Sequence, residues 1–165
     1  MTRIHPATDL QDYKSIELLA IEIWNEHYTP IIGKAQVDYM LDKFQSVRAI
    51  QSQIEEGAHY YVIRYENEDV GYISFYKQED TLFLSKIYVS SHFRGKGIGK
   101  VAMNFIEDQA RTSGYRTISL TVNKYNTNSI KAYEKMDFKK IEALVMDIGN
   151  GYVMDDYKME KALKP

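Results

Sequence analysis

The sequence predicts an α/β sandwich whose central sheet is mixed and mostly antiparallel. Three observations lead to this class. Apolar side chains recur at helical spacing in residues 9–54, strand-like segments joined by short polar turns follow in residues 59–89, and a strand, helix, strand unit comes after them. Short turns join antiparallel neighbours, whereas a parallel pair needs a crossover such as a helix. The sheet is therefore expected to contain both kinds of pair.

The N-terminal third is expected to be helical. In residues 9–27 four apolar side chains share one helical face, and the Thr29–Pro30 step followed by Gly33 interrupts this pattern. A second helical stretch, residues 35–54, is expected to be split near residues 44–46. Two or three helices therefore precede the first long strand.

The middle of the chain is expected to form three neighbouring strands. Residues 59–65, 70–77 and 81–89 are rich in Tyr, Val, Ile and Phe, which are enriched in strands. The polar segments between them are too short for a crossover, so these strands are expected to run antiparallel.

The C-terminal half is expected to alternate helices and strands. An amphipathic helix follows Gly99 and ends at Gly114, and residues 118–122 then alternate as a strand. Asn126 is expected to be the N-cap of a last helix, because its side chain can accept from the free N–H groups of the first turn. Two final strands are expected around residues 149–151.

Length and composition limit the classes of function. With 165 residues, 44% of them apolar, the chain is expected to form a single domain over residues 1–165. The formal net charge of -2 gives no basic field for a nucleic acid or an anionic membrane, so neither is expected as a partner. The lack of cysteine excludes a thiol enzyme. No apolar stretch has the length of a membrane span or a signal-peptide core, and we expect a cytoplasmic protein.

A glycine-rich segment between a predicted strand and a predicted helix is the first candidate site. It runs from Val89 to Lys100. Free N–H groups at the start of a helix bind anions, and glycines let an anion approach the backbone. The glycines are Gly95, Gly97 and Gly99, and the cations beside them are Arg94, Lys96 and Lys100. Together these residues favour a pyrophosphate group as the ligand.

The spacing argues against two other phosphate-binding loops. A Walker loop needs a hydroxyl residue after its Gly-Lys pair, but Val101 follows Lys100. A dinucleotide fingerprint needs a further glycine at position 100, and its ribose is bound by an acidic residue where this chain has Asn123–Lys124. A glycine-rich turn beside a solvated basic helix end remains the alternative at this point.

Two motifs in register resemble the GNAT family of N-acetyltransferases. The segment Arg94–Gly99 matches the family's Arg/Gln-x-x-Gly-x-Gly/Ala signature. The second signature, Asn-x-x-Ala/Ser-x-x-x-Tyr-Glu-Lys-x-Gly-Phe, is matched by Asn126, Ser129, Tyr133, Glu134, Lys135 and Phe138. The resemblance covers roughly residues 60–140. Asp137 stands at the usual glycine of the second signature, and we expect it to adopt the left-handed backbone needed there.

The resemblance implies acetyl-coenzyme A as the cosubstrate and a GNAT-type sheet that splays after its fourth strand. The main chain of Ile87 and Val89 would pair with the pantetheine arm, and the Val89 N–H would stabilise the tetrahedral oxyanion. Tyr133 would be the general acid that protonates the departing thiolate. The residues implied in cofactor binding are Ile87, Tyr88, Val89, Arg94, Gly95, Lys96, Gly97, Ile98, Gly99, Lys100, Asn126, Ser129 and Lys135.

The motifs leave the general base open. Relatives in the family often carry a Glu on the strand before Ile87, where this chain has Ser85. The remaining candidates are the carboxylates of Glu22, Glu26, Asp155 and Asp156. His59 and His92 are expected to have structural roles, and because no His/Asp/Glu cluster has metal-ligand spacing, no metal is expected.

The acceptor is expected to be a primary amine of a small molecule, with a polyamine as the leading example. Trp24 and Tyr28 would line its pocket, and Asp156 would offer negative charge to a polycation. Two alternatives stay open, namely a protein or peptide N-acetyltransferase and a coenzyme A binding module without catalysis. A homodimer through the last strands also fits this fold, since an unpaired edge strand invites a partner.

Overall fold

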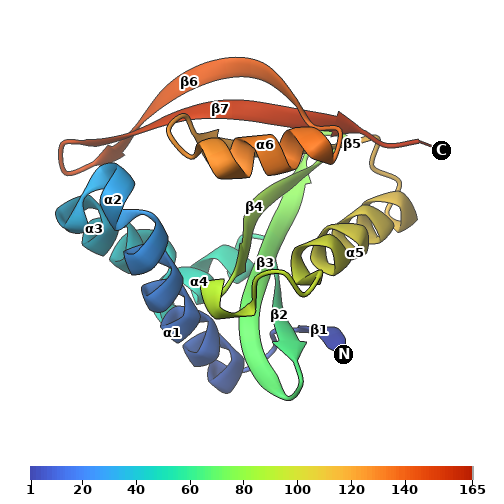
Figure 1. Cartoon of the computed structure of the whole chain (residues 1–165), viewed down its shortest axis with the longest axis horizontal. Coiled ribbons are helices and arrows are strands. Elements are labelled where there is room, and N and C mark those ends of the chain that lie inside the picture. Colours follow the sequence, from blue (N-terminus) through green and yellow to red (C-terminus); the bar gives the residue numbers. More distant parts are fainter. Residues whose placement is uncertain (165) are drawn as a thin grey trace. The chain divides into compact units, whose positions relative to one another are not determined.

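The computed structural model describes residues 1–164. Its elements, in chain order, are β1 (Thr2–Pro6), α1 (Leu10–His27), α2 (Thr29–Ile32), α3 (Lys34–Phe44), α4 (Val47–Glu55), β2 (His59–Tyr65), β3 (Glu68–Gln78), β4 (Thr81–Val89), the 3-10 turn η1 (Ser91–Phe93), α5 (Ile98–Thr112), β5 (Thr117–Asn123), α6 (Thr127–Lys135), β6 (Lys139–Gly149) and β7 (Tyr152–Ala162) (Figure 1). The predicted helices and long strands are present near their expected bounds, and the α/β class is confirmed.

The sheet is mixed, as predicted. Its seven strands follow the order β1-β2-β3-β4-β5-β7-β6. The pairs β1–β2, β2–β3, β5–β7 and β6–β7 are antiparallel, whereas β4 and β5 are parallel. The parallel ladder joins residues 81–83 to residues 117–119 and ends there, before the last residues of either strand. The carboxyl end of β5 continues only in its ladder with β7, among the residues that the structure describes.

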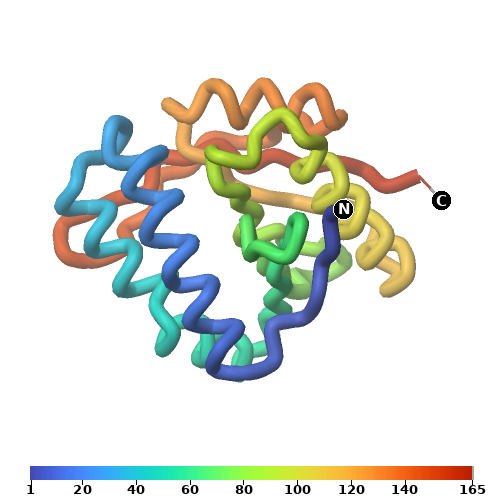
Figure 2. The backbone as a smooth tube through the Cα atoms, turned by 60° about the horizontal axis from the view of Figure 1, so that its bottom comes forward, coloured from blue at the N-terminus to red at the C-terminus, as the bar shows by residue number. Residues whose placement is uncertain are grey.

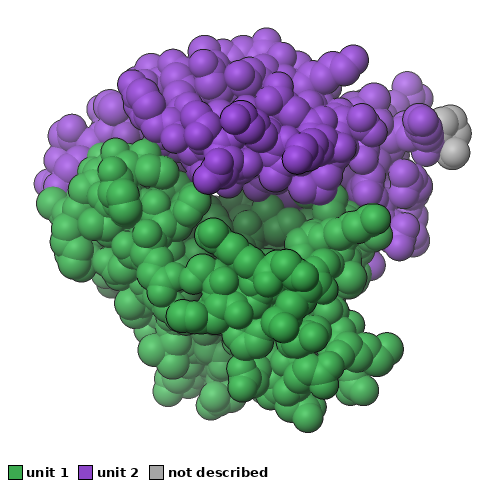
Figure 3. Space-filling view, in the orientation of Figure 1, with its two compact units in different colours: residues 1–76, 85–106 green, residues 77–84, 107–165 purple. Residues whose placement is uncertain are grey.

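The chain divides into two compact units that alternate along the sequence (Figure 3). Unit 1 consists of residues 1–76 and 85–106. Unit 2 consists of residues 77–84 and the C-terminal part from residue 107 on. The chain therefore passes from one unit to the other three times. The expectation of a single domain stays a prediction.

The four N-terminal helices of unit 1 contact one another. Helix α1 contacts α2, α3 and α4, and the tube in Figure 2 traces this group of helices. Side chains cap two of them: Asp9 accepts from the Asp12 N–H at the start of α1, and Ser46 accepts from the Ala49 N–H at the start of α4. Its core consists of fully buried side chains, including Ile16, Val37, Ile50, Val62, Ile63 and Ile73. Removing such side chains from water is the main term that holds the unit together.

Unit 2 is built around β7, which lies between β5 and β6. Ile118 on β5 and Met159 on β7 are fully buried, and Phe138 is 2% exposed. Strand β6 is different, because nearly all of its side chains are exposed and it has one strand neighbour in the described sheet. With β1 at the other side, it forms one of the two edges of the described sheet.

The structure departs from the sequence-based expectations in two elements of unit 1. Strand β1 was not expected, because its five residues carry only Ile4 as an aliphatic side chain, yet its backbone pairs with β2 along its whole length. The break predicted at Thr29–Pro30 holds a one-turn helix, α2. Proline is tolerated in the first turn of a helix because the N–H that it lacks has no partner there.

Candidate active site

The predicted anion loop lies in unit 1, between η1 and α5. Gly95 and Gly97 have φ values of +77° and +74°, a left-handed backbone that glycine adopts without a steric cost. A Cβ added at Gly95, Gly97 or Gly99 would meet no atom within 4 Å, so the space beside the loop is open. Helix α5 then begins with a hydrogen bond from the Val101 N–H to the Gly97 carbonyl oxygen, 3.1 Å.

The charges at this helix pole are exposed. Arg94, Lys96 and Lys100 all face solvent, and the Lys96 ammonium lies 5.6 Å from the centre of the Tyr65 ring. Ile98, in contrast, is 2% exposed and anchors the first turn of α5. The loop thus combines left-handed glycines, free N–H groups and three cations, which suits an anionic phosphate group.

Strand β4, which leads into this loop, makes a close backbone contact with β3 that the sequence analysis missed. A Cβ added to Gly71 on β3 would lie 2.2 Å from the Tyr88 carbonyl oxygen, so only glycine allows this approach. The Ser90 N–H donates to the Val70 carbonyl oxygen at 2.7 Å. Ile87, Tyr88 and Val89 are half-buried. A glycine inside a strand is itself a signal of close backbone approach.

An aromatic cluster joins α1 to β4 in unit 1. The ring centres of Trp24 and Tyr28 are 4.4 Å apart, and both rings lie beside Tyr88, at 5.8 and 6.4 Å. Trp24 is 5% exposed, whereas Tyr28 and Tyr88 are half-buried. The structure thus brings Trp24 and Tyr28 together, and it gives Trp24 mostly a packing role.

Lys86 is a buried ionisable group that the sequence analysis overlooked. It is 5% exposed, and burial lowers its pKa to about 7. Its Nζ donates to the Phe44 carbonyl oxygen at 2.5 Å, to Gln53 Oε1 at 3.0 Å and to the Tyr60 hydroxyl. These acceptors match the three donors of an ammonium group, so Lys86 ties β4 to the end of α3.

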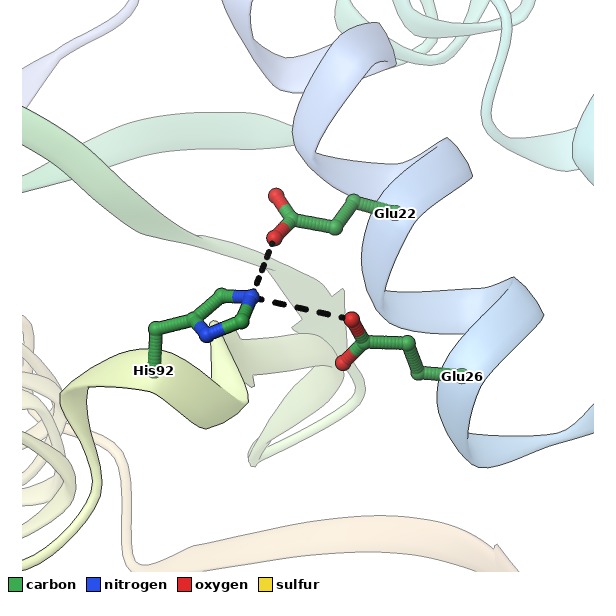
Figure 4. Close-up of side chains that lie close together, drawn as sticks. All are labelled: Glu22, Glu26 and His92. Atoms are coloured by element: carbon green, nitrogen blue, oxygen red, sulfur yellow. Dashed lines mark ion pairs between the residues drawn. The ribbon is translucent and has the colours of Figure 1, made fainter.

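Three exposed side chains gather where α1 meets η1 (Figure 4). His92 Nε2 lies 3.3 Å from Glu22 Oε1 and 3.7 Å from Glu26 Oε1, and the Ser91 hydroxyl donates to Glu26 Oε2 at 2.6 Å. These contacts suit the structural role expected for His92. One ligand atom from each of the three charged residues lies within 4.8 Å of the others, so they could hold a metal ion, but hydrogen bonds and ion pairs already account for their positions.

Tyr133 lies on α6 in unit 2. It is half-buried, and its ring centre is 5.7 Å from that of Phe138. Asp137 has a φ of +72°, so the left-handed backbone predicted for it is confirmed. That conformation lets the Phe138 N–H donate to the Tyr133 carbonyl oxygen at 3.0 Å. This bond closes the helix end and holds the backbone of Tyr133 in place.

The Asn126 side chain does not do what was expected of it. Asn126 occupies the N-cap position of α6 and is 4% exposed, but within the described part of the chain its side chain makes no capping hydrogen bond. Asn123 Oδ1 instead accepts from the Tyr125 N–H at 2.9 Å and forms the turn before the helix. Ser129 is half-buried and Lys135 is exposed.

The two adjacent aspartates of β7 differ sharply. Asp155 lies 2.6 Å from the Lys124 ammonium. Asp156 is 2% exposed, and its pKa is raised to about 6, first by burial and then by the charge of Asp155. The charge of Lys124 and a hydrogen bond with the Thr121 side chain act in the opposite direction and lower this pKa. A carboxylate that titrates close to neutrality is suited to accept a proton from a substrate.

The predicted site residues therefore form two sets. Unit 1 holds the glycine loop, the end of β4 and the aromatic pair Trp24 and Tyr28, and unit 2 holds Asn126, Ser129, Tyr133, Lys135 and Asp156. None of the helices in residues 1–164 combines the length and the apolar character that crossing a bilayer demands.

Comparison with known proteins relates this arrangement to one family. The model of the acetyltransferase (GNAT) family matches residues 19–138. An uncharacterized N-acetyltransferase of Methanocaldococcus jannaschii is 29% identical over 76 residues, which are 46% of this chain but only 34% of that protein. An uncharacterized N-acetyltransferase of Bacillus subtilis is 24% identical over 129 residues, 72% of this chain and 73% of that protein. The crystal structure of PaiA N-acetyltransferase from Thermoplasma acidophilum with coenzyme A has a TM-score of 0.80 at 19% identity, covering 98% of this chain and 99% of that one.

Proposed function

The chain belongs to the GNAT family of acetyltransferases, and from this premise we propose that it transfers the acetyl group of acetyl-coenzyme A to a primary amine of a small molecule. The observation that carries the proposal is the glycine loop at the start of α5. Its left-handed Gly95 and Gly97 leave the first-turn N–H groups open beside exposed cations. These are the features that a pyrophosphate needs.

Coenzyme A would be held mainly by backbone groups. The loop Arg94–Lys100 would bind the pyrophosphate, and the main chain of residues 87–89 would pair with the amides of pantetheine. The contact between Gly71 and the Tyr88 carbonyl oxygen supports this role, because it sets the position of the strand that would receive the cofactor. Asn126, Ser129 and Lys135 would complete the binding from the second motif.

The proposed chemistry is direct attack of the amine on the thioester. The carbonyl oxygen becomes an oxyanion in the transition state, and a fixed donor such as the Val89 N–H stabilises it without reorganising. Collapse of the tetrahedral intermediate breaks the carbon–sulfur bond, and Tyr133 supplies the proton that the thiolate needs. With a reference pKa of about 10, a tyrosine hydroxyl is protonated at neutral pH and can act as this acid.

A polyamine is the proposed example of the acceptor. Glu22 and Glu26 present two exposed carboxylates on α1, and such carboxylates attract an ammonium group. Opposite charge at a binding surface raises the local concentration of a cationic substrate.

A homodimer in the cytoplasm is the proposed state of the protein. The open edge strand β6 supports the dimer, because Ile141, Val145 and Met146 are 50%, 63% and 38% exposed along it. Val145→Lys would then turn the dimer into a monomer in analytical ultracentrifugation. A wild-type protein that sediments as a monomer at all concentrations would contradict this. Cell fractionation tests the location.

The test of the function is thiol release from acetyl-coenzyme A. The wild-type protein would be assayed with spermidine, putrescine, glucosamine, lysine and an alanine-terminated peptide. Turnover with a small amine supports the proposal, and preference for the peptide would favour a peptide acetyltransferase. Binding of coenzyme A in calorimetry without turnover of any of these amines would favour a non-catalytic binding module.

A further inference from the structure

We propose that Thr121 and Asp156 form a proton relay that serves as the general base for the acceptor amine. This inference rests on the proposed function. It names the group that the family motifs leave open, because Ser85 stands where a carboxylate is frequent in relatives.

The register places both side chains on one face of the β5–β7 ladder. Asn123 pairs with Asp156, and Thr121 pairs with Lys158. Opposite residues share a face and so do residues two apart, so Thr121 and Asp156 are diagonal neighbours. A hydrogen bond with the Thr121 side chain lowers the pKa of Asp156 against the effect of burial. The register therefore makes the two side chains neighbours, and this interaction links the groups that the relay needs.

Exposure separates the roles of the two residues. Thr121 is half-buried, whereas Asp156 is 2% exposed. Thr121 is therefore the more accessible of the two residues to an amine, and Asp156 lies out of bulk water. A carboxylate held out of water binds a proton more readily than an exposed one, and it receives that proton through the hydroxyl rather than from solvent.

The position of the pair also suits a site. Thr121 lies at the carboxyl end of β5, beyond Ser119, where the parallel ladder with β4 ends. Ligands of open α/β sheets bind outside the carboxyl ends of parallel strands. Asn126, the first residue of the second motif, follows three residues after the end of β5.

The charges around Asp156 favour this carboxylate over its neighbour. The Lys124 ammonium lies 2.6 Å from the Asp155 carboxylate, so Asp155 is held in a structural ion pair. Asp155 raises the pKa of Asp156, and Lys124 lowers it. On the same face Lys158 follows two residues later on β7, and the residue opposite Asp156 on β6 is the apolar Leu144.

The proton and electron movements balance. One N–H bond of the substrate ammonium breaks, its proton goes to the Thr121 oxygen, and the hydroxyl proton of Thr121 goes to Asp156. The freed nitrogen lone pair forms the C–N bond while the carbonyl π electrons move to oxygen. The C–S bond then breaks, sulfur takes the Tyr133 proton, and the phenolate removes the second proton from nitrogen. Asp156 finally releases its proton to solvent, so each turnover yields an amide, a free thiol and one proton.

The test is the pH dependence of thiol release with the amine panel for wild type, D156N, T121V, T121S and D155N. We expect kcat/KM of the wild type to fall below about pH 6, where Asp156 becomes protonated. Both D156N and T121V are expected to lose about 100-fold in kcat/KM at pH 7.5, because general-base catalysis contributes a factor of this order. D156N is also expected to lose the fall of kcat/KM at low pH, which is the acid limb of the profile.

Two variants distinguish the relay from a merely structural role. T121S keeps the hydroxyl and is expected to keep most of the activity. D155N removes a charge that raises the pKa of Asp156, so its acid limb is expected at lower pH with the plateau retained. Thermal unfolding and coenzyme A calorimetry identify any variant that is misfolded.

The outcomes separate the two proposals. A wild type that turns over an amine while T121V keeps the wild-type pH profile overturns the relay alone. The same holds if D156N retains the acid limb. A wild type that turns over none of the amines overturns the proposed function, and the relay is overturned with it.

Discussion

The two units offer different kinds of group to the proposed reaction. Unit 1 offers backbone amides, left-handed glycines and exposed cations, which bind but do not exchange protons. Unit 2 offers Tyr133 and Asp156, which can donate and accept them. Lys86 is the exception in unit 1, because its pKa is about 7, but its three donors are taken up by three acceptors of unit 1 and it has no part in the proposed reaction. If this proposal holds, binding by the glycine loop and proton transfer by Tyr133 and Asp156 can be altered separately.

The sharpest test of this contrast is Tyr133→Phe. Removing the hydroxyl removes the proposed acid but keeps the ring beside Phe138, so we expect kcat to fall by roughly 100- to 1,000-fold. Coenzyme A affinity in calorimetry should change less than about threefold, since the ring stays in place. A large loss of affinity would mean that Tyr133 binds the cofactor, and the contrast between the units would fail.

The matching change in unit 1 is Gly97→Val. A β-branched residue at a φ of +74° is strained, and its side chain would occupy the space beside the loop. We expect coenzyme A to bind about 100-fold more weakly by calorimetry. Gly99→Ala is the control, because Gly99 is outside the left-handed region and its added methyl meets no atom within 4 Å. Equal affinity for Gly97→Val and the wild type would refute the assignment of this loop.

Lys86 gives a test that involves stability alone. Its pKa is about 7 in the folded protein and about 10.5 in the unfolded chain, so between these values the unfolded chain binds more protons. Raising the pH through this window therefore stabilises the fold, by about 2 kcal/mol between pH 7 and pH 9 for this group. Lys86→Met should remove this contribution in denaturant titrations, and the exposed Lys131→Met should leave it in place. An unchanged pH dependence in Lys86→Met would show that Lys86 titrates normally.

The smallest effect is expected from Glu26→Gln. The carboxylate lies near His92 and accepts from Ser91, but all of these groups are at the surface. We expect less than about 1 kcal/mol of stability to be lost in thermal unfolding at low salt, and less still at high salt. A much larger loss, or stabilisation of the wild type alone by added zinc ions, would indicate that the three residues hold a metal.

Local patterns predicted most of the fold. Alternation and short turns identified the strands from β2 to β5, and the motif containing Asp137 predicted its left-handed backbone, which the structure confirms. The family resemblance is confirmed by the match over residues 19–138. Strand β1 was not predicted, because it is held by pairing with β2 rather than by a buried face of its own.

The site was predicted less completely, because its missing parts depend on contacts between distant residues. Lys86 meets a carbonyl oxygen 42 residues away, and no pattern around Lys86 signals that partner. The sequence alone does not distinguish Asp155 from Asp156. In the structure they differ, because Asp155 forms an ion pair and Asp156 is buried. Gly71 was detectable in principle, as a glycine inside a strand.

The alternation of the units along the chain has a consequence for synthesis on the ribosome. The start of β4 leaves the ribosome well before its parallel partner, since Thr117, which contacts Thr81, comes 36 residues later. At roughly 5–20 residues per second, that edge waits about 2–7 s for its neighbour. During this interval that edge of β4 presents unpaired backbone groups, the kind of surface through which nascent chains associate.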